Sequence, residues 1–493
     1  MPILSQIGRK DPKTRMLIAF IYGALSVVAA TMIYPFLLMI SGSFKSGVDR
    51  QQWDVLPRYL HDDAMLFRKF VQTKYNDSLP AANSTYKTRC FSFEKFEPPV
   101  TLHERAVGDW KEFLAGKRVR EDFQTLGFLF EFGAAPRNLR LLKQHLQAKT
   151  DGDLRAFNSR YGTSYERWSD VTPTHSVLWV ERWSDRHYQF IGEPLGSMYR
   201  EFRDGRSPFE FYPMSLDGDF LERQIYPRFG KFKIEQVNHA YGTNFASFSE
   251  ICLPARRPNN SAFAGDWEQY ARTLLHPRFI RVEAAAKPAY EEFIRKKYQT
   301  IAAFNTIYGT QHHDWSDAPL PSEVRETGVQ LGDFAQFIET TAPLHAIVLV
   351  GTEFEFRDFL RRKHRNDLAA LNQTHGSHHA AFEAVPIPAL EYDWSEMQAH
   401  RAEVKAEFVC RNYAVVLDYL VLHGRAFWNT VIYCALSILT ALVVNQLAAY
   451  ALSRYPLPSQ YKILFFLMAT MAFPGEVTLI PNFLLLKQCN LLN

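Results

Sequence analysis

Residues 427–453, FWNTVIYCALSILTALVVNQLAAYALS, contain no charged side chain, and Arg454 ends the run. The run is 27 residues long, whereas an α-helix needs roughly 20 residues to cross the hydrocarbon core of a bilayer. Its strongly polar residues are Asn429, Asn445 and Gln446, too few for the polar stripe that a soluble helix of this length carries. The stretch therefore predicts a transmembrane helix at residues 426–453.

Another apolar run, residues 463–486, follows a short basic turn at residues 454–462. Four residues interrupt this run: Pro474, Gly475, Glu476 and Pro481. Such residues are tolerated at membrane depth where the backbone lies against protein rather than lipid. We expect a further span here, either kinked or ending early.

The start of the chain also contains a long run without charged residues. Residues 1–15 are basic, and residues 16–44 contain no charged side chain. A cleavable signal peptide is the alternative, but the apolar run is longer than the roughly 7–15 residues of a signal core. We therefore expect residues 16–44 to be a retained first span, which gives the chain three spans.

Three runs carry a family resemblance: YPFLLMISGSFK at residues 34–45, LAAYALSRY at residues 447–455 and FPGEVTLIP at residues 473–481. They resemble the permease subunits of bacterial binding-protein-dependent (ABC-type) carbohydrate importers, in the group of the maltose permease. The resemblance covers residues 1–45 and 427–493 and does not extend to the region between them. It makes residues 426–493 a partial ABC permease domain.

The resemblance implies several partners. They are a second permease subunit, a cytoplasmic ATP-binding subunit and an extracytoplasmic solute-binding protein, with membrane lipid around the spans. Because the sequence contains no Walker-type phosphate loop, we expect ATP hydrolysis in the separate subunit, and neither enzyme activity nor a cofactor in this chain. Family members also have later spans and a coupling helix with a Glu-Ala-Ala motif. We therefore expect the sequence to be a fragment or to be completed by another chain.

Basic residues set the expected orientation, because positively charged loops stay in the cytoplasm. The N-terminus, residues 1–15, and the turn at residues 454–462 are both basic. We expect both segments to be cytoplasmic and residues 45–425 to be extracytoplasmic. The chain is then a multi-pass protein of the bacterial plasma (inner) membrane, which the resemblance also implies.

The region between the first two spans is close to neutral. Of the chain's 56 basic and 52 acidic side chains, 8 and 2 lie outside residues 46–425, which leaves this region 48 and 50 and a net charge of −2. Nucleic-acid binding needs a concentrated basic face. We therefore expect no nucleic-acid partner.

The same region contains an internal repeat, an Asn-x-x-Tyr-Gly-Thr motif followed by an aromatic residue. Copies or close variants lie near residues 157–170, 237–250, 304–317 and 371–383, and a degenerate first copy is expected near residues 71–77 with Asn76 in the glycine position. The apolar runs at residues 279–282 and 346–350 are expected to be strands. The predicted fold class is an α-helical membrane protein with three spans and a large α+β extracytoplasmic domain of internal repeats.

A structural role for the motif is favoured. Glycine adopts the left-handed conformation that ends a helix more cheaply than other residues, and the aromatic residue can fold back on that helix. The alternative is a sugar-stacking platform in each copy. The motif also resembles a short helical segment of certain bacterial beta-galactosidases, which contains no catalytic residue. The candidate anchor or ligand-platform residues are Asn158, Tyr161, Trp168, Asn238, Tyr241, Phe248, Asn305, Tyr308 and Trp315.

No catalytic, cofactor-binding or metal-binding set is predicted. Two histidine pairs, residues 312–313 and 378–379, follow glycine turns, and His375 lies close to the second pair. Adjacent histidines point apart, and the sequence shows no carboxylate or thiol that completes a zinc set. Three cysteines outside the spans fit neither a zinc spacing nor a disulfide framework, and one bridge among them stays open: Cys90, Cys252 and Cys410.

Two functions remain open. The first is the permease subunit of an ABC-type importer for sugars or related solutes, whose external domain engages the substrate or the solute-binding protein. The second is a membrane-anchored extracytoplasmic carbohydrate-binding or interaction module without transport activity, and a tethered carbohydrate-active enzyme is a weaker third. The permease-like runs on both sides of residues 45–425 favour the first function, because an anchor needs only one apolar span. No motif identifies the solute.

Overall fold

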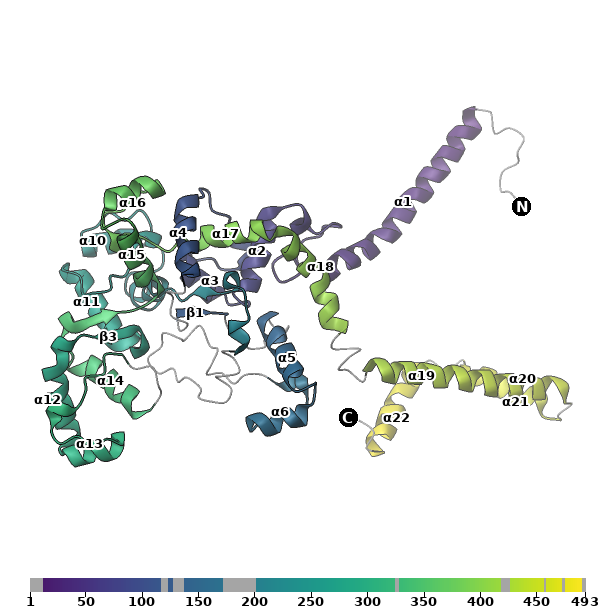
Figure 1. Cartoon of the computed structure of the whole chain (residues 1–493). Helices are drawn as coiled ribbons and strands as arrows, with labels where there is room; N and C mark the ends of the chain where they lie inside the picture. The colour runs from purple at the N-terminus through teal and green to yellow at the C-terminus, as the bar shows by residue number, and fades with distance from the viewer. Residues whose placement is uncertain are drawn as a thin grey trace. The chain divides into compact units, whose positions relative to one another are not determined.

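The computed structural model describes residues 12–116, 123–126, 137–171, 201–323, 328–417, 426–455, 458–471 and 475–489. The chain divides into two compact units, Met1–Val409 and Cys410–Asn493. The first unit contains α1 (Pro12–Ser43) and the repeat domain, which we define as residues 46–409, and the second contains α19 to α22 (Figure 1).

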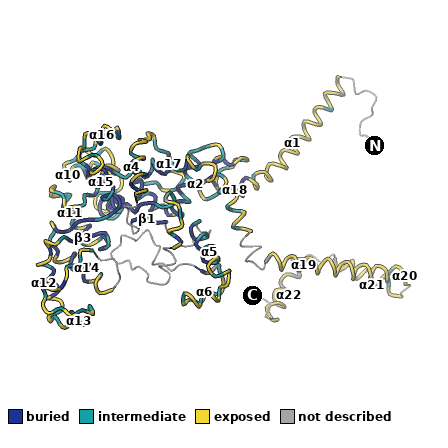
Figure 2. The backbone as a smooth tube through the Cα atoms, in the orientation of Figure 1, coloured by how far each residue is buried: buried dark blue, intermediate teal, exposed yellow. Residues whose placement is uncertain are grey.

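Two apolar helical stretches among the described residues are long enough to cross a membrane, Arg15–Ser43 and Phe427–Arg454, with mean hydropathies of 2.2 and 1.9. The second consists of α19 (Ala426–Thr440), a π-helical turn (Ala441–Asn445) and α20 (Gln446–Arg454). Both stretches are exposed along their length (Figure 2). They coincide with the first two predicted spans.

The third predicted span, residues 463–486, falls on two helices. These are α21 (Gln460–Met471) and α22 (Gly475–Gln488), with 12 and 14 residues. Residues 472–474 lie outside the described part of the chain. Because each helix is shorter than the roughly 20 residues of a membrane-spanning helix, a third span stays a prediction.

Five similar repeats build the repeat domain, and each begins with two helices. The first helices are α2 (Asp63–Lys74), α5 (Arg137–Lys149), the consecutive segments α8 (Leu216–Phe220), η7 (Leu221–Ile225) and α9 (Tyr226–Phe229), then α12 (Lys287–Tyr298) and α15 (Thr352–Lys363). The second helices are α3 (Leu79–Tyr86), α6 (Leu154–Tyr161), α10 (Ile234–Tyr241), α13 (Ile301–Tyr308) and α16 (Leu368–His375).

A 3₁₀ turn follows in each repeat, and a third helix is described in four of the five. The 3₁₀ turns are η2 (Phe93–Lys95), η4 (Trp168–Asp170), η8 (Phe248–Glu250), η12 (Trp315–Asp317) and η14 (Phe382–Ala384). The described third helices are α4 (Glu104–Ala115), α11 (Ser261–Gln269), α14 (Val329–Thr340) and α17 (Ala389–Ala399). In the second repeat this position falls at residues 172–200, outside the described residues.

The strands of the repeat domain are short. β1 (Gln124–Thr125) pairs antiparallel with β2 (Tyr212–Pro213), and β3 (Ile280–Val282) pairs antiparallel with β4 (Ile347–Leu349). The strands predicted at residues 279–282 and 346–350 are confirmed as β3 and β4. Among the described residues the domain is mainly helical, and its α+β character is limited to these two strand pairs.

The first and fifth repeats exchange their third helices. In the third and fourth repeats the third helix packs on the second helix of its own repeat, α11 on α10 and α14 on α13. By contrast, α4 of the first repeat packs on α15 and α16, and α17 of the fifth repeat packs on α2 and α3. The apolar cores follow the same pattern, because Trp110 and Phe113 of α4 lie in one cluster with Phe356 and Phe359 of α15.

The two ends of the repeat domain also lie against each other. Phe408 of α18 (Arg401–Leu417) packs edge to face on Tyr59, with ring centroids 5.8 Å apart. The Lys405 ammonium group donates to the Leu60 carbonyl at 2.7 Å. A domain whose two ends meet can be inserted between consecutive elements of another fold without separating them.

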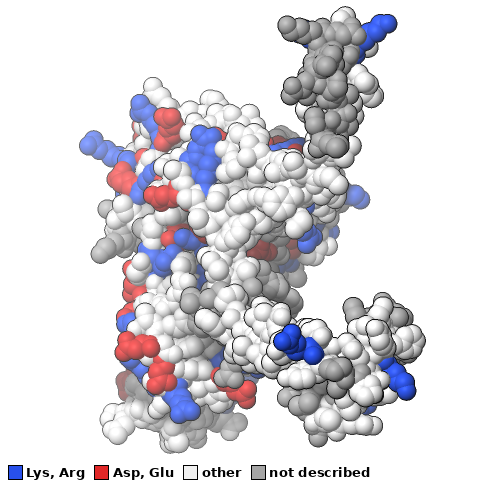
Figure 3. All heavy atoms as spheres, turned by 90° about the vertical axis from the view of Figure 1, so that its right-hand side faces the viewer, with Lys and Arg blue, Asp and Glu red and all other residues white. Residues whose placement is uncertain are grey.

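Charges of both signs are mixed on one face of the repeat domain. On the face shown in Figure 3, Lys and Arg side chains alternate with Asp and Glu side chains. Residues 46–425 contain 48 basic and 50 acidic side chains, so neither sign is in large excess.

Gly218 permits a close approach between the first and third repeats. A Cβ atom added to this residue of α8 would lie 2.0 Å from the Ser84 carbonyl oxygen of α3. We predict that Gly218→Ala lowers the free energy of unfolding by about 3 kcal/mol, because backbone cannot move aside cheaply in a packed core. Gly265→Ala in α11, where an added Cβ meets nothing within 4 Å, should instead gain about 0.5–1 kcal/mol of helix stability.

Thermal unfolding of the two purified full-length variants, followed by circular dichroism in the same detergent, checks this pair. Equal melting temperatures for the two variants would contradict the close contact between α3 and α8.

Candidate functional site

Each repeat motif forms a clamp around one asparagine side chain. In the fourth repeat the Asn305 amide donates to the His312 carbonyl at 2.8 Å, and its oxygen accepts from the Thr310 hydroxyl and the His312 amide at 2.8 and 3.0 Å. Asn158, Asn238 and Asn372 make the same three bonds to the residues five and seven positions later. The next turn is thereby fixed to the end of the second helix.

A glycine in the left-handed conformation lies within each of these four clamps. Gly162, Gly242, Gly309 and Gly376 follow the second helices with φ of 64–66°, a conformation in which a side chain is strained. The predicted helix-ending role of these glycines is therefore confirmed.

The first copy of the motif lies at Asn83, so its predicted position near residues 71–77 is wrong. The Asn83 amide donates to the Cys90 carbonyl, and its oxygen accepts from Thr88 and from the Cys90 amide, each at 2.9 Å. Lys87 occupies the glycine position with φ of 52°. Asn76 instead donates its amide to the Leu126 carbonyl, far from any motif.

The predicted aromatic platform residues make contacts within the chain. The Trp168 indole donates to the Gly152 carbonyl at 2.9 Å, and Phe248 is buried against Tyr226. Trp315 is half-buried and packs edge to face on Phe304. Tyr161 packs on Phe157 at a centroid distance of 4.8 Å. These contacts favour the anchoring interpretation, and the sugar-platform alternative stays a prediction.

Aspartates in the third helices are structural residues that the motif did not reveal. Asp109, Asp266, Asp333 and Asp393 are buried, with exposed fractions of 7, 0, 3 and 2%. Tyr241 and Tyr308, two of the predicted anchors, donate their hydroxyl protons to Asp266 and Asp333 at 2.6 Å. The signal was present in the sequence, because each aspartate directly precedes an aromatic residue: Trp110, Trp267, Phe334 or Trp394.

Two of these aspartates accept hydrogen bonds from the same repeats on which their exchanged helices pack. Asp393 of the fifth repeat accepts from Lys74 and Tyr86 of the first repeat, both at 2.6 Å. Asp109 of the first repeat accepts from Lys363 and His375 of the fifth repeat at 2.8 and 3.0 Å. The hydrogen bonds to Lys363 and His375 outweigh burial and lower the pKa of Asp109 to about 2.

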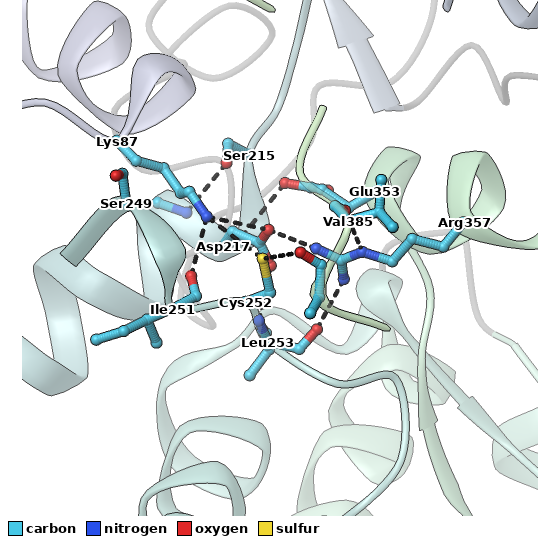
Figure 4. Close-up of polar contacts among 12 residues, drawn as sticks. Lys87, Ser215, Asp217, Ser249, Ile251, Cys252, Leu253, Glu353, Arg357 and Val385 are labelled. Carbon is cyan, nitrogen blue, oxygen red and sulfur yellow. Dashed lines mark hydrogen bonds and ion pairs between the residues drawn. The ribbon is translucent and has the colours of Figure 1, made fainter. Parts of the chain in front are cut away.

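A second buried cluster joins the third and fifth repeats (Figure 4). The Arg357 guanidinium group of α15 bonds to the Asp217 carboxylate of α8 at 2.6 Å and to the carbonyls of Leu253 and Val385, both at 2.9 Å. Arg357 and Asp217 are 3 and 2% exposed. A buried ion pair is stable only when further hydrogen bonds satisfy its remaining polar groups, and the two carbonyls meet that requirement for the guanidinium.

Lys87 extends this cluster to the first repeat. Its ammonium group points at the Ile251 carbonyl at 3.0 Å and at Asp217 at 3.7 Å (Figure 4). Lysine in a left-handed conformation costs roughly 1 kcal/mol relative to glycine, and these contacts offset that cost.

Glu353 lies beside the same cluster and is 1% exposed. Burial and the nearby Asp217 carboxylate raise the pKa of Glu353 to about 7, although Arg357 opposes the shift. Burial also raises the pKa of the Cys252 thiol next to Lys87. All five cysteines are free, so the open disulfide among Cys90, Cys252 and Cys410 is not formed in this structure.

Two histidines and one carboxylate lie close together, although the sequence predicted no metal-binding set. The carboxylate that the sequence did not reveal is Asp109, whose oxygen lies with the ring nitrogens of His364 and His375 in one group spanning at most 4.8 Å. The pairs at residues 312–313 and 378–379 are not part of this group.

Two of the three permease-like runs lie on the helices of the second unit, and residues 34–43 of the other lie in α1 of the first unit. LAAYALSRY lies in α20 up to Arg454. The described part of FPGEVTLIP starts with Gly475 at the beginning of α22. The Gln460 amide of α21 donates to the Leu452 carbonyl of α20, which ties the two helices together across the basic turn.

Comparison with known proteins gives one partial similarity. A probable ABC transporter permease protein of Pyrococcus horikoshii is 32% identical over 84 residues, which are 17% of this chain and 30% of the relative. The chain thus matches less than a third of the relative's length. No protein-family model and no solved structure matches the chain. The match supports a relationship to ABC transporter permeases, while the carbohydrate group stays a prediction.

The raised pKa of Glu353 predicts a pH-dependent stability. Because the pKa is about 7 in the folded chain against an ordinary 4.5, the folded state binds the proton more tightly, and the contribution of Glu353 to stability falls as pH rises through this interval. Relative to the wild type, Glu353→Gln should therefore gain stability between about pH 5 and 8, by at most about 3 kcal/mol.

Melting temperatures of full-length wild type and variant across this pH range measure the effect. Glu383→Gln, which alters a glutamate on the surface, is the matched control and should show no such trend. A difference between Glu353→Gln and wild type that does not change with pH would contradict the assignment.

Proposed function

We propose that the chain is a permease subunit of an ABC-type importer for sugars or related solutes. The observation that carries the proposal is the LAAYALSRY run, at the end of a charge-free membrane-length helix. The partial similarity to an ABC transporter permease protein supports it. The carbohydrate class rests on the family resemblance of the three runs.

The orientation follows from charge. Positively charged loops stay in the cytoplasm, and Arg454 and Lys462 flank the turn between α20 and α21. With the basic N-terminus also in the cytoplasm, residues 45–425 lie outside a bacterial plasma membrane that the chain crosses three times.

The repeat domain is then an insertion between the first and second spans. The contacts of Tyr59 with Phe408 and of Leu60 with Lys405 support this arrangement, because they bring the two ends of the insertion together. Outside the membrane, the domain engages the solute or its binding protein. Its mixed surface charge fits a neutral or weakly polar partner better than a nucleic acid.

The remaining subunits supply what this chain lacks. A separate cytoplasmic subunit hydrolyses ATP, because no Walker-type loop occurs in this sequence. A second permease subunit contributes further spans to the transport pathway.

A native complex tests the proposal. The affinity-tagged chain, extracted from its own membranes with mild detergent, should co-purify with an ATP-binding subunit and a second permease subunit. In proteoliposomes, the ATPase activity of this complex should rise severalfold when a solute-binding protein and its sugar are added. Isolation of the chain without an ATP-binding subunit, or an ATPase rate insensitive to every tested solute, would contradict transport.

The second candidate function is a membrane-anchored binding module. It is favoured by the closed core of the repeat domain, in which the first and last repeats contact each other directly. The full-length chain alone in nanodiscs should then bind a saccharide without any partner. Saccharide binding only in the presence of the solute-binding protein would favour the importer.

A further inference from the structure

Two of the buried third-helix aspartates accept hydrogen bonds from the same set of side chains, one lysine and two tyrosines. In the first repeat these are the Lys74 ammonium group and the hydroxyls of Tyr75 and Tyr86, which bond to Asp393 at 2.6, 3.4 and 2.6 Å. In the fourth repeat the equivalent residues Lys297, Tyr298 and Tyr308 bond to Asp333 at 2.8, 2.5 and 2.6 Å. One lysine and two tyrosines thus surround one buried carboxylate in both repeats.

The fifth repeat keeps the lysine and replaces both tyrosines with histidine. Lys363 lies 2.8 Å from Asp109 Oδ1. His364 Nε2 and His375 Nε2 both face Asp109 Oδ2, at 3.5 and 3.0 Å. The fifth repeat thus places two imidazole nitrogens beside one carboxylate oxygen.

The two distances to Asp109 Oδ2 are close to the spacing of zinc ligands, and the three candidate ligand atoms all lie within 4.8 Å of one another. A separation of 3.5 Å is long for a hydrogen bond. Two ligand atoms that are each about 2.0–2.1 Å from a tetrahedral zinc ion are about 3.3 Å apart. The two distances to Asp109 Oδ2, 3.0 and 3.5 Å, lie on either side of that value. Two imidazoles and one carboxylate are a common protein ligand set for zinc, with water in the fourth position.

The surroundings hold the three ligands in place. Lys363 occupies the other oxygen of Asp109 and orients the carboxylate, as partners beyond the ligands do in known metal sites. His375 is the last residue of α16, directly before Gly376 and within the Asn372 clamp. The side chains of Asp109, His364 and His375 are 10, 11 and 4% exposed, so the cluster is shielded but reaches the surface.

We propose that Asp109, His364 and His375 bind one Zn²⁺ ion. The ion connects α4 of the first repeat to α15 and α16 of the fifth repeat, and so it fastens the exchanged helix. The proposal concerns the repeat domain alone and holds whether or not the chain transports a solute.

Zinc binding by the full-length chain in detergent tests the proposal. After removal of metal with a chelator, the wild type should bind one zinc ion per chain in equilibrium dialysis, and its melting temperature should rise by several degrees. The double variant His364→Tyr/His375→Tyr restores the residues of the first and fourth repeats, so it should fold. It should bind no stoichiometric zinc, and its melting temperature should not respond to the metal.

His378→Tyr is the matched control, because His378 is exposed and lies three residues from His375 without facing Asp109. This variant should bind zinc as the wild type does. Absence of stoichiometric zinc in the wild type, or equal zinc binding by the double variant, would overturn the proposal.

Discussion

The repeat domain depends on a buried carboxylate whose partners lie at the other end of the chain. Asp393 and Lys74 are 319 positions apart in the sequence, and their side chains are 2 and 3% exposed. Loss of either partner leaves an uncompensated buried charge, which costs about 3–5 kcal/mol. This contact therefore couples the stability of the fifth repeat to that of the first. Asp109 and Lys363 form the reciprocal contact, in which the lysine side chain is 34% exposed.

This exchange distinguishes the domain from a simple linear array of repeats. In a linear array each repeat contacts its neighbours, and special capping repeats cover the two ends. Here α4 and α17 cover the partner repeat at the opposite end instead, and the Arg357–Asp217 pair adds a contact between the third and fifth repeats. The closed arrangement also keeps Tyr59 and Phe408 together, as in domains that tolerate insertion between two elements of another fold.

The features that depend on residues close together in the sequence could be predicted from it. Gly309 has the left-handed conformation that its place after the second helix predicts, and the Asn305 clamp follows from local hydrogen bonding. The position of the first copy was mispredicted because Lys87 stands where the other copies have glycine, and its strain is offset by Asp217, which is distant in sequence. The third-helix aspartates repeat visibly in the sequence, but the donors of Asp393 and Asp109 belong to repeats that no local pattern connects to them. The candidate metal-binding group of Asp109, His364 and His375 was missed for the same reason.

Zero-length cross-linking in native membranes tests the helix exchange most directly. A water-soluble carbodiimide joins lysine to glutamate only where the two side chains touch. The exchange predicts recovery of peptides in which Lys363 of α15 is joined to Glu112 of α4, two partly exposed residues that form an ion pair. Cross-links from α4 to α2 or α3, without the Lys363–Glu112 product, would contradict it.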